Sequence, residues 1–379
     1  MQAIYLDHAS STPVRGEVRE AMLPFLSERF GNPSSAHGWG QESRVQLEEA
    51  RARLARLIGA SPGEIVFTSG GTEADNLAIL GRARLFPGSP VVCSALEHRA
   101  VLASAHAAEE DGSPLHLLRT SEDGVIDVST LDALLSPSPA VVSVMWVNNE
   151  LGTIQPVEAL ASRCEQAEVT FHTDAVQALG KLRLRIDEVP VSLLSLSAHK
   201  VGGPKGMGAL FVRKGTRLRP LHYGGGHERG LRAGTENVAG AVGFALAAEL
   251  AEAEREAEMV RLGAQRARLE EGLRSRIVGL LVNGAAAPRV ASICNVSVPG
   301  ADSEMLVLTL DMEGLAVSSG SACSSGAIAP SHVLTALGLP ADVAGPSVRF
   351  SLGRTTKDSD IDRVLAVFPS LVERMRQTA

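Results

Sequence analysis

The stretch VSLLSLSAHKVGGPKG, residues 191–206, decides the fold of this protein. Its first half is a near-continuous apolar run, which is typical of a strand buried on both faces of a parallel sheet. Ser197, His199 and Lys200 follow where that strand ends, and glycines and a proline come next. Burial lowers the pKa of a lysine and frees its amine as a nucleophile, so Lys200 is a candidate Schiff-base lysine. From this stretch alone, a surface lysine after a strand is an equal alternative.

Outward from this stretch, strand-like and helical runs alternate over the first two thirds of the chain. Buried strands separated by helices predict an α/β domain, with a mostly parallel sheet covered by helices on both faces. The active site of such a sheet lies at the carboxyl ends of its strands. The strand-like runs are residues 64–70, 90–97, 140–150, 169–175, 191–200 and 208–214.

A different pattern follows in the last third of the chain. Residues 244–277 form a long helical stretch rich in Ala, Leu and charges of both signs. Two strand-like runs, ASICNVSV (291–298) and SVRFSLGR (347–354), and a final helical run predict a smaller α+β domain. We therefore expect a large domain of residues 15–255, and a small domain built from residues 1–14 and 256–379.

Composition excludes several classes of protein. The 379 residues carry a net charge of −7, which disfavours binding to nucleic acid or to acidic membranes. No apolar run approaches the roughly 20 residues that a membrane helix needs. The first residues, MQAIYLDHASSTP, lack the pattern of a secretory signal, so we expect a cytoplasmic protein.

The four cysteines fall into two groups. None belongs to a C-x-x-C pair, which disfavours a zinc site or a thioredoxin-like motif. Cys93 and Cys294 lie in strand-like runs and Cys164 in a helical run, so we expect them to act as small core residues. Cys323 lies in AVSSGSACSSGA (316–327), which reads as a mobile, exposed loop. It is either a reactive thiol on a moving arm or a chance cysteine in a surface loop.

A second strand ends in an acid. In FHTDAVQALGK (171–181), Asp174 closes the strand and Gln177 follows three residues later. A strand-terminal Asp and a strand-terminal Lys suit pyridoxal phosphate, whose aldehyde binds a lysine and whose ring nitrogen needs an acid to stay protonated. The alternative for Asp174 is a helix N-cap.

Two glycine-rich stretches could bind anions. FTSGGTEADN (67–76) opens a helix directly after a strand, so Gly71 and Thr72 could hold a phosphate at the helix N-terminus. This turn matches neither G-x-G-x-x-G nor the Walker pattern, which makes a nucleotide-binding oxidoreductase a weak alternative. GGGHERGLRAGTEN (224–237) is either a flexible basic loop or an anion site that uses Thr235 and the backbone near Gly234.

Polar residues follow two further strands. His98 could stack on an aromatic cofactor and move protons, although a hydrogen-bonded structural histidine is the favoured interpretation when it is taken alone. Asn148 and Asn149, in VNNELG (147–152), could serve a phenolic oxygen or simply form a turn.

Together these segments resemble the cysteine desulfurases of the NifS/IscS type, a branch of the fold type I pyridoxal-phosphate enzymes. The resemblance runs over almost the whole chain, and many motifs in one order are far more specific than any single motif. It rests on IYLDHASSTPV, FGNPSS, EIVFTSGGTEADNLAI, EHRAV, VNNELGTIQP, HTDAVQALGK, SAHKVGGPKGMGAL, GGGHERGLRAGT, AVSSGSACSSG and SVRFSLGR.

The resemblance implies roles for individual residues. Lys200 would form the covalent link to pyridoxal 5'-phosphate, Asp174 would pair with the ring nitrogen, and His98 would stack on the ring. Gln177 and Asn149 would lie near the ring oxygen and the substrate. Arg354 would bind the substrate carboxylate, with Asn32 as a weaker candidate. The cofactor phosphate would be held by Gly71, Thr72, Ser197 and His199. Thr235 from the other subunit of a homodimer would complete this phosphate site.

The resemblance also implies a reaction. L-Cysteine would bind the cofactor, Lys200 would move the Cα proton, and the Cys323 thiolate would attack the substrate sulfur. The products would be L-alanine and a Cys323 persulfide for iron–sulfur cluster assembly or thiolation. No intrinsic metal is implied, although Cys323 could transiently ligate a cluster shared with a scaffold protein. The chain ends at LVERMRQTA, without the C-terminal tail that usually helps to dock that scaffold.

Two rival functions stay open at this stage. A transaminase or another lyase of the same fold would also need Asp174 and Lys200, but it would have no use for Cys323. A catalytically inactive sulfur carrier is disfavoured because Lys200, Asp174 and His98 are all intact.

Overall fold

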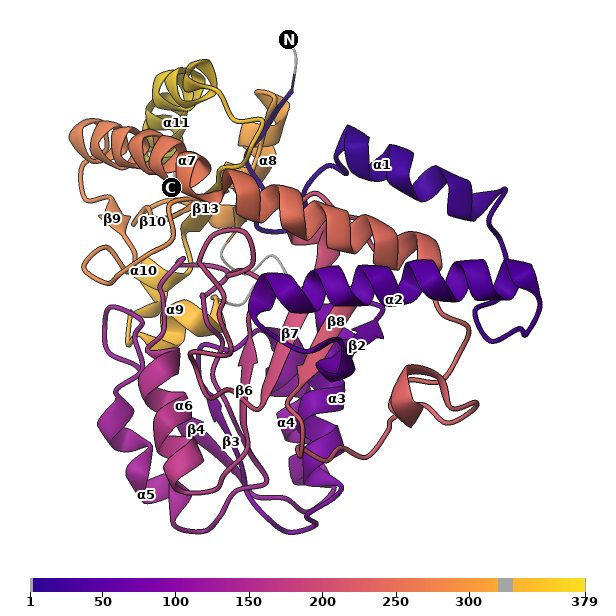
Figure 1. The fold of residues 1–379 in the computed structure, drawn as a ribbon. Coiled ribbons are helices and arrows are strands. Elements are labelled where there is room, and N and C mark those ends of the chain that lie inside the picture. Colours follow the sequence, from indigo (N-terminus) through magenta and orange to yellow (C-terminus); the bar gives the residue numbers. More distant parts are fainter. Residues whose placement is uncertain (1–2, 320–329, 379) are drawn as a thin grey trace.

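The computed structural model describes residues 3–319 and 330–378 (Figure 1). The loop cysteine Cys323 lies outside the described residues. In this part of the chain, no helix is long and apolar enough to cross a membrane.

The central feature of the described chain is a seven-stranded sheet with the order β2-β8-β7-β6-β5-β3-β4. β8 is antiparallel to both of its neighbours, and the other adjacent pairs are parallel. This arrangement confirms the predicted α/β fold with a mostly parallel sheet. The strands are β2 (Ile65–Thr68), β3 (Val91–Ser94), β4 (Leu115–Leu118), β5 (Val141–Ser143), β6 (Phe171–Asp174), β7 (Leu193–Ser197) and β8 (Gly208–Val212).

Helices cover both faces of this sheet because consecutive strand residues point to opposite sides. Val66, Val91 and Cys93 pack with α3 and α4, whereas Ile65 and Val92 belong to the larger core that includes α2, α6 and α7. The helices of this part are α1 (Gly16–Met22), α2 (Gly38–Ile58), α3 (Gly71–Ala83), α4 (Arg99–Glu110), α5 (Asp132–Leu135), α6 (Val157–Gln166) and α7 (Val238–Arg276).

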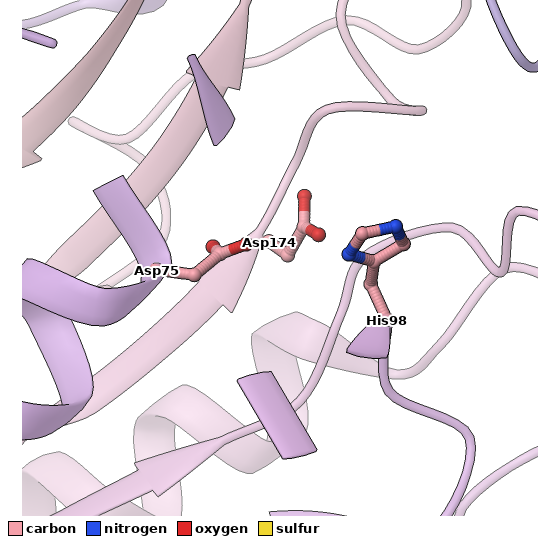
Figure 2. A group of neighbouring side chains, drawn as sticks. All are labelled: Asp75, His98 and Asp174. Atoms are coloured by element: carbon pink, nitrogen blue, oxygen red, sulfur yellow. The ribbon is translucent and has the colours of Figure 1, made fainter. Parts of the chain in front are cut away.

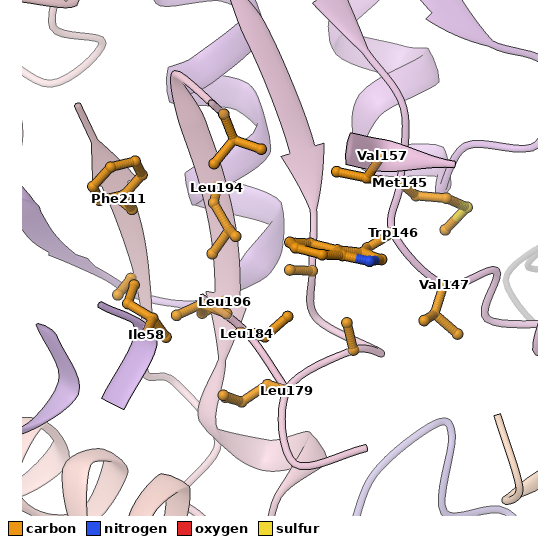
Figure 3. Packing of buried hydrophobic residues seen from close by; sticks show 14 of the residues in the cluster. Ile58, Met145, Trp146, Val147, Val157, Leu179, Leu184, Leu194, Leu196 and Phe211 are labelled. Atoms are coloured by element: carbon orange, nitrogen blue, oxygen red, sulfur yellow. The ribbon is translucent and has the colours of Figure 1, made fainter. Parts of the chain in front are cut away.

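Figure 3 shows the larger core, in which Trp146 lies among aliphatic side chains from several elements. Trp146 belongs to the run 140–150, for which a strand was predicted over its whole length. The strand is shorter, because β5 ends at Ser143; beyond it, the main chain of Trp146 bonds to Asp174 and Gln155. β4 was not predicted at all; it lies at the edge of the sheet, where Leu117 is exposed.

A second sheet, with the order β12-β13-β10-β9, lies beside a two-stranded pair of β1 and β11. The long helix α7 reaches from α2 to this region (Figure 1). A separate hydrophobic core forms here, and the division at residues 15 and 255 stays a prediction. The elements are β1 (Ile4–Tyr5), β9 (Leu281–Val282), β10 (Ile293–Ser297), β11 (Leu315–Ala316), β12 (Ser318–Ser319), β13 (Ser347–Ser351), α8 (Ser303–Met312), α9 (His332–Ala336), α10 (Ala341–Ala344) and α11 (Asp358–Thr378).

The three described cysteines are core residues, as predicted. Cys93 in β3, Cys164 in α6 and Cys294 in β10 are all fully buried. Burial raises the pKa of each thiol, to about 12 for Cys164, so none of the three is poised to react.

Candidate active site

A cavity of about 360 Å³ opens where β6 and β7 end and α3 begins. Its position agrees with the rule that such sites lie at the carboxyl ends of strands. The structure brings most of the predicted site residues to its wall, namely Gly71, Thr72, His98, Asn149, Asp174, Gln177, Ser197, His199 and Lys200.

Three other predicted residues do not line this cavity. Arg354 is exposed after the end of β13 and borders a neighbouring cavity. Asn32 is exposed, and its side-chain oxygen accepts a hydrogen bond from the Ser34 main chain. Thr235 is exposed on the segment that precedes α7, and in a single chain it does not line the cavity.

Lys200 ends a short 3-10 turn that follows β7 directly. Its Nζ donates hydrogen bonds to the main-chain oxygens of Ala9 (2.6 Å) and Ser10 (2.7 Å). The N-terminal segment therefore crosses the end of the large sheet and forms one wall of the cavity. The bond from Lys200 to Ser10 joins residues 190 positions apart, so local sequence patterns could not predict it.

Asp174 ends β6 and is 5% exposed. Its Oδ1 accepts a hydrogen bond from the main chain of Val176 (2.9 Å). The structure has a turn rather than a helix after Asp174, so the N-cap alternative is wrong, and this local bond leaves the carboxyl on the cavity wall. Burial raises the pKa of Asp174, and the nearby His98 and Lys200 oppose that shift.

Figure 2 shows Asp174 between Asp75 on one side and His98 on the other. One ligand-type atom from each of the three lies within 4.8 Å of the others. Asp75 is 1% exposed, and both its burial and the charge of Asp174 raise its pKa well above the ordinary value. Since two carboxylates this close in a dry site do not both ionise, Asp75 is the protonated member when Asp174 carries the charge.

His98 combines both interpretations offered by the sequence. Its Nδ1 accepts a hydrogen bond from the Ala100 main chain (3.2 Å) and caps α4, while the ring lines the cavity. Burial lowers the pKa of His98. Because Nδ1 is an acceptor, the neutral ring carries its proton on Nε2.

The start of α3 offers an anion site. No side chain caps this helix, so its first N–H groups are available to a ligand. Ser197 is 1% exposed, and its hydroxyl has no hydrogen-bond partner among the described residues. His199 is neutral at pH 7, because burial and the charge of Lys200 lower its pKa to about 4.

The two neighbouring asparagines have different roles. Asn148 is buried, and its side-chain oxygen accepts bonds from the main chains of Glu150 and Leu151. It forms the turn that was one alternative for this pair. Asn149 instead reaches the cavity wall.

Arg349, which was not predicted as a site residue, lines the cavity from β13 and is 4% exposed. It donates hydrogen bonds to the main-chain oxygen of Asn149 (2.9 Å), to Asp7 (2.9 Å) and to Ser10 (2.7 Å). Its Nε–H has no acceptor within the described chain. The alternating pattern of β13 could have indicated Arg349. Val348 and Phe350 pack into the second core, so the strand residue between them must point the other way.

Comparison with known proteins agrees with this geometry. Residues 4–364 match the aminotransferase class-V family. The chain is 44% identical to the cysteine desulfurase IscS of Dictyoglomus turgidum, over 98% of this chain and 95% of that protein. It is 46% identical to a cysteine desulfurase of Gluconacetobacter diazotrophicus, over 100% of this chain and 95% of that protein.

A solved structure of a NifS-like protein matches with a TM-score of 0.91 and 33% identity, over 98% of this chain and 100% of that one. The resemblance and the fold class predicted from the sequence are thereby confirmed. The chain belongs to the aminotransferase class-V family and, within it, to the cysteine desulfurases that it matches from end to end.

Proposed function

We propose that this protein is a pyridoxal-phosphate-dependent cysteine desulfurase, which removes sulfur from L-cysteine and leaves L-alanine. The observation that carries this proposal is the meeting of three residues in one cavity: Asp174 and Lys200 at the ends of the adjacent strands β6 and β7, and Arg349 from β13 of the other sheet. When bound, the cofactor supplies an electron sink for the charge that develops at the substrate Cα. All other steps belong to side chains of this protein.

The donor set fits the cofactor. Within the described chain, the Ser197 hydroxyl has no partner and no side chain caps α3, so both suit the phosphate, together with Gly71, Thr72 and His199. The buried carboxylate of Asp174 suits a protonated ring nitrogen, and the His98 ring lies close to Asp174. Lys200 provides the amine for the covalent link and afterwards holds or moves the substrate Cα proton.

Arg349 replaces Arg354 in our proposal for the substrate carboxylate. A guanidinium suits a carboxylate because its N–H groups form a planar fork, and the buried Nε–H of Arg349 has no acceptor among the described residues. Asn149 lies beside it, held through its main-chain oxygen. Arg354 is exposed to solvent and lies outside the cavity that contains Asp174.

Cys323 is the proposed sulfur acceptor. Its thiolate attacks the sulfur of L-cysteine, a sulfur–sulfur bond forms and the carbon–sulfur bond breaks. The electron pair of the broken bond stays with the β-carbon, which takes up a proton to give L-alanine. The persulfide on Cys323 then passes to an acceptor protein, such as an iron–sulfur scaffold or a thiolation enzyme. Because this chemistry needs a reduced thiol, we place it in the cytoplasm.

We also propose that the protein is a homodimer in which Thr235 completes the partner's phosphate site. Leu26, Phe30 and Trp39 are 66%, 69% and 63% exposed, an unusual concentration of large apolar side chains. The segment that carries Thr235 lies on the same side of the molecule as α1 and α2 (Figure 1). A test is to mix inactive Lys200→Ala and Thr235→Val chains, since mixed dimers contain one site with both residues intact. Activity that stays absent after subunit exchange would contradict the shared site.

One assay tests the main proposal. The purified protein is incubated with L-cysteine and a reducing thiol, and sulfide and alanine are measured together. Equal amounts of both over many turnovers support a desulfurase. Pyruvate and ammonia in place of alanine would instead identify a β-eliminating lyase, in which Cys323 has no chemical role.

A further inference from the structure

A second lysine lies close to Lys200 and has no part in the mechanism described so far. The Nζ of Lys181 donates a hydrogen bond to Oε1 of Gln177 (2.5 Å). Nε2 of Gln177 donates in turn to the main-chain oxygen of Ala9 (2.8 Å), which also accepts the bond from Lys200 (2.6 Å). One side-chain amide and one carbonyl therefore connect the two amines.

The two lysines also share a cavity. Lys200 lies between the candidate active site and a second cavity of about 100 Å³, and Lys181 lines that second cavity with it. The charged groups that act on Lys181 are Lys200 and Arg349, both positive. Burial and these charges lower the pKa of Lys181 to about 7. A second ammonium next to Lys200 is therefore disfavoured near neutral pH.

We propose that Lys181 is a positioning residue for Lys200, and that the two amines share one positive charge near neutral pH. When Lys181 holds that charge, Lys200 is a neutral amine that can attack the cofactor aldehyde. This inference rests on the proposed function, which assigns the cofactor link to Lys200.

The physical basis is reciprocal coupling. The charge of Lys200 disfavours an ammonium at Lys181, so the charge of Lys181 must disfavour an ammonium at Lys200 by the same free energy. The hydrogen bond also fixes Gln177, because an amide oxygen that accepts from Lys181 leaves the amide NH₂ facing Ala9 and the cavity wall.

The surrounding groups do not replace Lys181 in this role. In the second cavity, Glu254 pairs with Arg15. Glu258 also lines this cavity and pairs with Arg261, which does not line it. The other ionisable groups there are His8, whose pKa burial lowers to about 4, and the exposed Arg354. On the active-site side, the groups facing Lys200 are Asp75, His98, Asp174, His199 and Arg349.

The test follows the capture of pyridoxal phosphate by the full-length apoprotein. The neutral Lys200 amine attacks the aldehyde carbon, a C=N bond forms and one water leaves, and absorbance reports the product. We expect Lys181→Met to capture the cofactor about tenfold more slowly at pH 7. The difference should shrink at pH values above about 10.4, the ordinary pKa of a lysine, because Lys200 is then mostly neutral in both proteins.

Two further variants separate charge from packing. Lys181→Gln removes the charge but can still donate to Gln177, so it should show the same pH-dependent loss as Lys181→Met. Lys205→Met is the matched control, because it removes an exposed charge five residues after Lys200 and should behave like wild type at every pH.

The outcomes are distinguishable. Capture that slows by one constant factor at every pH, or that does not change, overturns the shared charge and leaves the proposed function intact. If Lys200→Ala captures the cofactor covalently as fast as wild type does, the proposed role of Lys200 fails and the inference fails with it.

Discussion

The guanidinium of Arg349 donates a hydrogen bond to the main-chain oxygen of Asn149 over 2.9 Å. This bond joins β13 of the small sheet to the loop that follows β5 of the large one. The two sheets therefore meet at the wall of the candidate active site. A ligand held by Arg349 on one side and by Lys200 on the other would contact both parts of the molecule.

The first prediction concerns substrate binding by Arg349. Arg349→Lys keeps the positive charge but loses the planar fork of N–H groups, so we expect kcat/KM for L-cysteine to fall about 100-fold, mainly through KM. Steady-state sulfide release measures both constants. Arg354→Lys is the matched control and should change kcat/KM by less than about twofold, because Arg354 is exposed. A large loss in Arg354→Lys with a small loss in Arg349→Lys would instead assign the substrate carboxylate to Arg354.

The second prediction separates two neighbouring carboxyls. Asp174→Asn removes the charge proposed to hold the ring nitrogen protonated, so we expect kcat to fall at least about 100-fold. Asp75→Asn should cost far less, because burial and Asp174 already keep the Asp75 carboxyl protonated. The bound cofactor's absorbance spectrum and the sulfide rate report the two effects. Equal losses in both variants would contradict the assignment of the charge to Asp174.

The third prediction concerns Cys323. Cys323→Ser should retain bound cofactor and its colour but release no sulfide, because a hydroxyl cannot take up the substrate sulfur. Cys164→Ala removes a thiol whose pKa burial raises to about 12, so it should still release sulfide. Sulfide release by the Cys323→Ser variant at the wild-type rate would exclude Cys323 as the acceptor.

The fourth prediction is a stability change with pH, caused by Glu97. This carboxyl is fully buried, and burial raises its pKa from 4.5 to about 8. Between these values the folded protein keeps a proton that the unfolded chain has lost, so Glu97 makes stability fall as pH rises through that range. Glu97→Gln should flatten the fall, measured as denaturation midpoints. An unchanged pH dependence would show that Glu97 ionises normally.

His172 should have the opposite effect at lower pH. It is fully buried, and burial lowers its pKa from 6.5 to about 3. As pH drops below 6.5, the unfolded chain takes up a proton that the folded protein does not, so stability falls. His172→Gln should reduce this acid sensitivity in the same denaturation experiment.

The fifth prediction concerns a buried ion pair at the base of the segment that carries Thr235. Arg51 and Glu228 form two hydrogen bonds of 2.7 Å, with side chains 5% and 2% exposed. Glu228→Gln leaves the Arg51 charge without its buried partner, which should cost about 3 kcal/mol of stability. The matched control is Glu188→Gln in the exposed Arg183 pair, which should cause no measurable loss. Equal effects would mean that burial of the pair is unimportant.

Much of this protein could be predicted from its sequence, because local patterns carry strong signals for buried strands. Apolar runs that end abruptly in polar residues located β6 and β7, and with them Asp174 and Lys200 at the edge of the sheet. Edge strands and strand ends carried less information. The sequence therefore did not indicate β4 at the sheet edge, or that β5 ends at Ser143.

By itself, then, the sequence determined the α/β fold, the family and the residue types of the site, since each of these follows from order and spacing along the chain. Tertiary structure decided which residues of similar chemistry reach the site. Arg349 faces the cavity and Arg354 does not, because side chains alternate along β13 and that strand ends at Ser351. Lys181 approaches Lys200 through Gln177 and Ala9, since the N-terminal segment folds across the end of the large sheet. The two bonds to Ala9 join residues 168 and 191 positions apart in sequence, so no local pattern contains them.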